Sequence, residues 1–155
     1  MTGNDTVEAA RTTSSVSPVE VTTDGGTSDL IVYVDRSTVC EGALADLKAG
    51  MADLVAFVEA NEPRILSYAV YFSPDGDRMT VIHEHPDPAS LAFHLEIGGP
   101  EFAKVGPFLD LETIDVYGRP GEAVLGQLRE KAETLGRGRV SVHDLHRGFE
   151  RVSGD

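Results

Sequence analysis

The sequence predicts one α+β domain, with an antiparallel four-stranded sheet covered by helices on one face. Strand-like and helix-like patterns follow one another in the order strand, helix, strand, strand, helix, strand. The PDGD segment at residues 74–77 separates two strand-like runs, and such a cluster favours a tight antiparallel hairpin. This βαββαβ order is the split βαβ arrangement of the ferredoxin-like fold. An extra C-terminal helix and a tail follow it.

The first half of the domain is defined by apolar periodicity. The β-branched and aromatic run at residues 30–37 predicts the first strand. A helix ending at Pro63 is predicted next, because apolar residues recur at steps of three and four. They are Leu44, Leu47, Met51, Leu54 and Val58. Residues 64–73 and 77–85 are the two hairpin strands.

The second half begins with a helix-start signal. Asp87 is placed to cap free amides, and Pro88 falls at the first helical position, where its missing N–H costs nothing. We expect this helix to break at Gly98-Gly99-Pro100. The predicted elements that follow are a short helical piece at 101–106, a strand within 108–118 and a helix within 121–136 whose apolar stripe is Val124, Leu125, Leu128, Ala132 and Leu135.

The chain divides into three parts on composition. Residues 1–28 are rich in Thr, Ser, Gly and Asp without apolar periodicity, which predicts a disordered leader. Residues 29–136 form the domain. Residues 137–155 are a tail that is expected to pack in part, because it carries several apolar side chains.

Charge and composition exclude several kinds of partner. With 26 acidic and 13 basic residues the formal net charge is -13, which disfavours binding to nucleic acid and to anionic membranes. No stretch reaches the roughly 18 apolar residues of a membrane span. A single cysteine, Cys40, fits a reducing compartment. A cytoplasmic location is expected.

Both alternating faces of the strand at residues 64–73 carry apolar side chains, such as Tyr68 and Val70 on one face and Ala69 and Tyr71 on the other. Two helices cover only one face of a four-stranded sheet. We therefore expect a homodimer that pairs the remaining sheet faces.

The element order, together with residues 58–95 (VEANEPRILSYAVYFSPDGDRMTVIHEHPDPASLAFHL), resembles the antibiotic biosynthesis monooxygenase family of dimeric α+β barrels over roughly residues 29–118. The residues at the family's motif positions are Tyr68, Glu84, Asp87, Leu91 and His94. The chain departs from the pattern in having no tryptophan and in carrying His85 where an aromatic residue is usual. The substrate preferences of the family are therefore not transferred.

The resemblance implies a cofactor-independent monooxygenase that acts on a small aromatic or polycyclic phenol. His94 or His83 would be the base and Glu84 would orient it. Tyr68 and Asn61 would donate hydrogen bonds to the substrate, and Phe93 would contact it. No glycine-rich nucleotide fingerprint is present, so no cofactor is expected.

A metal site is the other use considered for the histidines. On a strand His83 and His85 share one face, and His94 from the following helix would be a third ligand. We expect no metal, because His85 precedes Pro86 at the strand end and should be solvated.

A non-catalytic dimer that binds a small apolar molecule is the alternative function, and the missing tryptophan favours it. An isomerase or cyclase on the same scaffold is a third reading.

Overall fold

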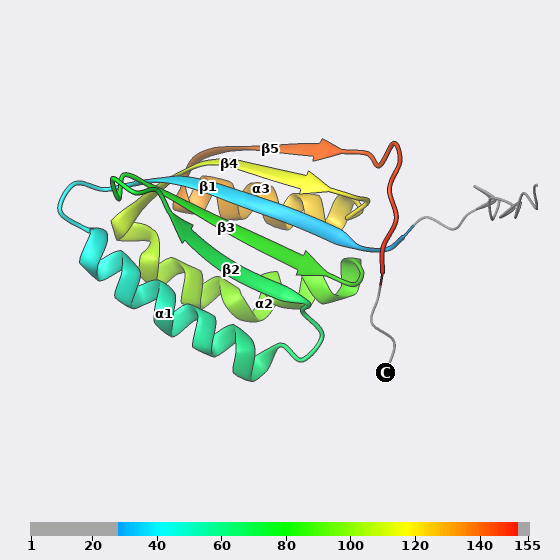
Figure 1. Cartoon of the computed structure of the whole chain (residues 1–155), viewed down its shortest axis with the longest axis horizontal. Helices are drawn as coiled ribbons and strands as arrows, with labels where there is room; N and C mark the ends of the chain where they lie inside the picture. Colours follow the sequence, from blue (N-terminus) through cyan, green and yellow to red (C-terminus); the bar gives the residue numbers. More distant parts are fainter. Residues whose placement is uncertain (1–27, 152–155) are drawn as a thin grey trace, which may run out of the picture.

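The computed structural model describes residues 28–151 and shows a five-stranded sheet in the order β2-β3-β1-β4-β5. Figure 1 shows the helices on one side of this sheet. The elements are β1 (Ile31–Val39), α1 (Leu44–Asn61), β2 (Ser67–Phe72), β3 (Arg78–His85), α2 (Pro88–Val105), the 3-10 helix η1 (Gly106–Phe108), β4 (Leu109–Tyr117), α3 (Glu122–Leu135) and β5 (Gly136–His143). The predicted ferredoxin-like order is confirmed over β1 to β4. The expected leader, apart from Ser28, lies outside the described residues.

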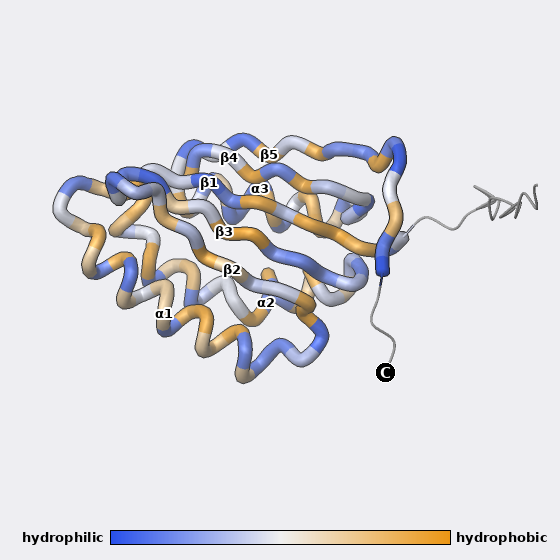
Figure 2. Tube along the Cα trace, in the orientation of Figure 1, coloured by the Kyte–Doolittle hydropathy of each residue, from blue (hydrophilic) through white to orange (hydrophobic). Residues whose placement is uncertain are grey.

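The helices pack through the predicted apolar stripes. In α1 the buried residues are Leu47, Met51, Leu54 and Val58, and all five predicted stripe residues of α3 are buried. Figure 2 shows hydrophobic and hydrophilic positions alternating along the helices, as expected when one stripe faces the core. None of the helices in residues 28–151 is long and apolar enough to cross a membrane.

The predicted break of α2 at Gly98-Gly99-Pro100 is wrong, because the helix runs without interruption from Pro88 to Val105. Gly98, Phe102 and Val105 are buried and continue the stripe that begins at Leu91. Burial of this stripe outweighs the hydrogen bond that Pro100 removes. The separate helical piece expected at 101–106 is therefore the last turn of α2 and the start of η1.

The predicted four-stranded antiparallel sheet lacks one strand that the structure has. Part of the expected tail forms this strand, β5, which pairs in parallel with β4. Gly136 allows this pairing, since a Cβ there would lie only 2.4 Å from the backbone nitrogen of Leu111. The β4-α3-β5 unit thus adds a strand to the edge of the predicted fold.

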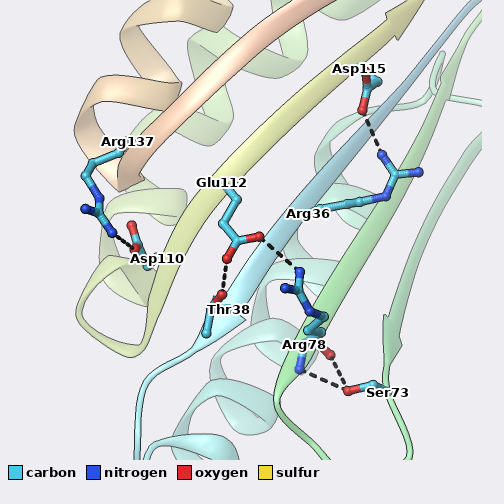
Figure 3. A network of polar contacts seen from close by, with 8 residues as sticks. All are labelled: Arg36, Thr38, Ser73, Arg78, Asp110, Glu112, Asp115 and Arg137. Atoms are coloured by element: carbon cyan, nitrogen blue, oxygen red, sulfur yellow. Dashed lines mark hydrogen bonds and ion pairs between the residues drawn. The ribbon is translucent and has the colours of Figure 1, made fainter.

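The face of the sheet away from the helices is mixed in character. Its strands β1, β3, β4 and β5 carry a network of ion pairs and hydrogen bonds, shown in Figure 3. The pairs are Arg36 with Asp115, Arg78 and Thr38 with Glu112, and Arg137 with Asp110. The outer face is therefore less apolar than the sequence suggests, although Tyr71 on β2 is 56% exposed.

Candidate functional site

Three histidines meet in the interior between the sheet and α2. His83 and His85 point to the same side of β3, and His94 reaches them from α2. All three are 0% exposed, and the ring centroid of His94 lies 5.1 Å from those of both His83 and His85. The strand alternation predicted for His83 and His85 is confirmed, but the expectation that His85 is solvated is wrong. The start of α2 covers it.

His94 is held by Glu62, the residue that follows α1. Nδ1 of His94 lies 2.7 Å and 2.8 Å from the two carboxylate oxygens of Glu62. Burial raises the pKa of Glu62 to about 7 and lowers the pKa of His94 to about 3. The imidazole is thus neutral at pH 7. Opposite an ionised Glu62, Nδ1 carries the proton and donates it, so Nε2 keeps a free lone pair.

His83 is held by a buried ion pair between β1 and α3. Its Nε2 lies 3.2 Å from Asp35 Oδ2, and Lys131 Nζ lies 2.6 Å from the same oxygen. Burial acts to raise the pKa of Asp35, but Lys131 and His83 together hold it well below its usual range. Because an ionised carboxylate only accepts, Nε2 of His83 donates and Nδ1 keeps the lone pair.

His85 is held by the first turn of α2. Its Nδ1 lies 2.9 Å from Oγ of Ser90, which is 3% exposed. The Ser90 amide in turn donates to Oδ1 of Asp87 at 2.8 Å, so the predicted helix cap is confirmed and also positions the serine. Burial lowers the pKa of His85 to about 2. This ring, too, is neutral.

Each histidine therefore uses one ring nitrogen for a partner and leaves the other without one. Nδ1 of His83, Nε2 of His85 and Nε2 of His94 are buried and have no hydrogen-bond partner among the described residues. One ring nitrogen can be taken from each histidine so that the three nitrogens lie within 4.8 Å of one another. Buried polar atoms are rarely left unpaired, so this arrangement indicates a functional centre.

Aromatic side chains surround the centre. The ring of Tyr33 stacks on His83 at 3.7 Å between centroids, and Tyr68 meets His83 edge-on at 4.8 Å. Burial raises the pKa of both tyrosines, which keeps their hydroxyls protonated at neutral pH. They can donate hydrogen bonds to a negatively charged oxygen.

A pocket of about 280 Å³ opens between α2 and α3. Phe102 and Lys131 line it, whereas no histidine does. The Phe102 ring lies 5.1 Å from that of His94, and Lys131 bonds Asp35 on the other side. These two side chains separate the pocket from the histidines.

The structure brings together some of the predicted site residues and not others. His83, His94 and Tyr68 lie in the cluster. Glu84 does not pair with His94, because it points to the opposite face of β3, and Glu62 holds that position instead. Asn61 is exposed and its side chain donates to the carbonyl of Phe57, and Phe93 is 44% exposed. Neither of these two residues contacts the cluster.

The sequence reasoning missed Tyr33, Asp35, Glu62, Ser90 and Lys131. Two of them carried a signal. Asp35 is an acidic residue on the buried side of an apolar strand, and Lys131 follows Leu128 by three positions on the apolar stripe of α3. A buried acid and a buried base of this kind usually pair.

Comparison with known proteins shows likeness at the level of the fold. No family model matches the sequence, and no curated protein matches it. The structure of MupZ from Pseudomonas fluorescens superposes with a TM-score of 0.64 at 19% identity, over 82% of this chain and 93% of that one. SnoaB from Streptomyces nogalater, a cofactor-independent oxygenase, gives 0.51 at 21% identity over 61% of this chain and 96% of that one.

A proposed antibiotic biosynthesis monooxygenase from Caulobacter crescentus gives a TM-score of 0.50 at 22% identity, over 62% of this chain and 92% of that one. The resemblance noted from the sequence is thus confirmed for the fold. The chain has the α+β, ferredoxin-like fold found in antibiotic biosynthesis monooxygenase structures, extended by α3 and β5.

Proposed function

We propose that this protein is a monooxygenase without an organic cofactor that acts on a small aromatic phenol. The observation that carries the proposal is the buried imidazole of His94, which is neutral, held by Glu62 and has a free Nε2. Burial makes the ring neutral and so able to accept a proton, and the Glu62 carboxylate on Nδ1 opposes the effect of burial by making the imidazole more basic. The fold shared with SnoaB, a cofactor-independent oxygenase, supports the same class of reaction.

The chemistry needs few groups. Nε2 of His94 takes the phenolic proton, and the resulting phenolate reacts with dioxygen. One oxygen atom becomes a second carbonyl on the ring and the other leaves as water, so a phenol is converted to a quinone with no external reductant. The protonated hydroxyls of Tyr68 and Tyr33 donate hydrogen bonds to the negative oxygen that develops.

The pocket between α2 and α3 supplies a route for the substrate. Its lining combines the apolar Leu95 and Phe102 with the ammonium group of Lys131. An aromatic ring fits beside the apolar side chains, and the ammonium group attracts a phenolate. Phe102 has to turn aside for the substrate to reach His94.

The test is oxygen uptake by the purified protein with a panel of phenols and naphthols. We expect turnover with at least one compound, and a loss of 10²-fold or more in His94→Ala, in line with the ~10²–10⁴-fold contribution of a general base. His146→Ala is the matched control, because His146 is exposed. Uptake no faster in the wild type than in His94→Ala across the panel contradicts the proposal.

A second candidate is a non-catalytic protein that binds a small apolar molecule. It is favoured by one observation: the pocket is lined by no histidine, and the three rings are 0% exposed. A thermal-shift screen with the same phenols distinguishes the two, because a binder is stabilised by a compound that it leaves unchanged.

A further inference from the structure

We propose that His83, His85 and His94 are the protein ligands of one divalent transition-metal ion. This proposal goes beyond the proposed function, because it concerns what the histidines bind whether or not the protein is an oxygenase. It revises the expectation from the sequence that no metal is bound. The reason given for that expectation, a solvated His85, does not hold in the structure.

The geometry is close to that of a three-histidine site. The three contributed nitrogens lie within 4.8 Å of one another. Around a zinc ion with bonds of about 2.0–2.1 Å, tetrahedral ligand nitrogens are about 3.3 Å apart. To reach this spacing from 4.8 Å, each ring nitrogen moves inward by about 1 Å.

In each ring we call the nitrogen with a hydrogen-bond partner the outer nitrogen and the other the inner nitrogen. The outer nitrogens, Nε2 of His83 and Nδ1 of His85 and His94, have partners like those of histidine ligands in known metal sites. Histidine ligands generally donate their second N–H to a carboxylate, carbonyl or hydroxyl, which fixes the tautomer and the ring orientation. Here Asp35 holds His83, Ser90 holds His85 and Glu62 holds His94. The inner nitrogens have no partners among residues 28–151, and in His83 and His94 an ionised carboxylate on the outer nitrogen leaves the inner one with the lone pair.

An ion would satisfy acceptors that are otherwise costly to bury. A buried ring nitrogen without a hydrogen-bond partner is costly, and three such atoms lie together here. Charge also favours a cation, because two carboxylates, Asp35 and Glu62, face one ammonium group, that of Lys131. A divalent ion with an anionic fourth ligand, such as hydroxide or phenolate, brings the cluster to neutrality.

The donor set selects the kind of metal. Imidazole nitrogens suit Zn²⁺, Fe²⁺, Co²⁺ and Cu²⁺, whereas Mg²⁺ and Ca²⁺ require oxygen ligands. Three protein ligands leave a fourth position open, as in catalytic rather than structural zinc sites. In the metal-bound form His94 would be a ligand instead of a base, and the cation would supply Lewis acidity that lowers the pKa of a phenol at the open position.

The test is metal binding by the chelator-treated full chain, prepared without a histidine tag and in a Cys40→Ser background that removes the exposed thiol. Titration with Co²⁺, followed by visible absorption and calorimetry, should saturate at one equivalent per chain with a four-coordinate spectrum. Zn²⁺ should displace the Co²⁺ and raise the Tm. None of these readouts depends on turnover, so failure here and failure of the oxygenase proposal are distinguishable.

Variants decide which residues bind. We expect His85→Gln and His94→Gln to abolish the four-coordinate spectrum, and Glu62→Gln to weaken Co²⁺ binding 10–100-fold while leaving its stoichiometry unchanged. His143→Gln and His146→Gln, at exposed positions, are the controls and should bind as the wild type does. Should the ligand variants fail to fold, the wild-type spectrum and the Glu62→Gln affinity still decide.

Two results would overturn the proposal. One is the absence of stoichiometric Co²⁺ or Zn²⁺ binding by the folded wild-type chain. The other is a four-coordinate Co²⁺ spectrum that persists in His85→Gln and His94→Gln.

Discussion

At the scale of single residues, the buried ion pair between Lys131 and Asp35 sets the charge next to His83. The side chains of Lys131 and Asp35 are 9% and 7% exposed, and their charged atoms lie 2.6 Å apart. The ammonium group keeps Asp35 ionised, and the ionised carboxylate fixes the tautomer of His83. The amine of Lys131 also lies over the ring of Phe102, 4.4 Å from its centroid.

Replacing Lys131 by methionine should destabilise the protein by about 3–5 kcal/mol, because the charge of Asp35 is left buried without its partner. Urea unfolding of Lys131→Met measures this. Lys104→Met is the control, since Lys104 pairs with Glu101 on the surface and its loss should change stability by less than about 1 kcal/mol. Equal effects in the two variants would show that the Lys131 pair contributes nothing special.

The histidines predict how stability depends on pH in the metal-free protein. The pKa values of His83 and His94 are about 3 and that of His85 is about 2 when folded, against about 6.5 for an unfolded chain. Below pH 6.5 the unfolded state therefore binds more protons. Glu62 acts in the opposite direction between pH 4.5 and 7, because burial raises its pKa to about 7.

Because three histidines outweigh one glutamate, stability should fall by about 2–3 kcal/mol for each pH unit between 6.5 and 4.5. Urea unfolding with a chelator present, at several pH values in this window, checks the slope. The slope should be smaller in His85→Gln and unchanged in His146→Ala. A flat or rising stability toward acid would mean that the imidazoles are already protonated in the folded state.

The sequence predicted part of this site for clear physical reasons. Strand alternation places His83 and His85 on one face, and helical spacing from Leu91 turns His94 inward. Their partners could not be predicted in this way, because Glu62 lies after the end of α1 and Asp35 lies on a different strand. Only the packing of α1 and β1 around β3 brings these carboxylates to the rings.

At the scale of elements, α2 depends on one small residue. A Cβ on Gly98 would lie 2.7 Å from Cζ of Phe102, so glycine leaves the space that this ring occupies. A Cβ added to the next residue, Gly99, would have no other atom within 4 Å. The two neighbouring glycines of one helix therefore form a matched pair.

We expect Gly98→Ala to destabilise the protein by about 1–3 kcal/mol, because the added methyl group displaces the Phe102 ring. Gly99→Ala should instead stabilise it by up to about 1 kcal/mol, because alanine is the better helix former. Thermal or urea unfolding compares the two variants. A stabilised Gly98→Ala would show that the Phe102 ring does not need the space.

The break expected in α2 shows the limit of local signals. Two glycines and a proline in succession are typical of a helix end, and they predict one here. The buried side chains of Phe102 and Val105 lie beyond them on the same stripe, and their packing against the core keeps the helix intact. The start of α2 at Asp87 and Pro88 was predicted correctly, because capping is a local interaction.

At the scale of the whole molecule, the fold was predictable up to β4. The fifth strand was not, because its alternating run has only two large apolar side chains, Val140 and Val142, and because α3 separates it in the sequence from its partner β4. Parallel pairing depends on α3 packing against the sheet and on the close approach of Gly136 to Leu111. Neither of these is visible as a local pattern.

The expected homodimer remains a prediction for the outer face of the sheet. We propose that β2 forms its centre, because Tyr71 is exposed there and the ion-pair network lies over β1, β3, β4 and β5. Sedimentation should give a dimer for the wild type and a monomer for Tyr71→Glu. Phe93→Glu is the control, since Phe93 is exposed on α2 on the other side of the sheet. A monomeric wild type would refute the prediction.

The central claim is that three neutral imidazoles turn their unpartnered ring nitrogens toward one point. Nitrogen-15 NMR of the histidine side chains in the metal-free protein tests it most directly, at about pH 8.5, where Glu62 with its pKa of about 7 is ionised. We expect three buried neutral rings, with the proton on Nε2 in His83 and on Nδ1 in His94. Positively charged rings, or protons on the inward nitrogens, would contradict both the base and the metal site.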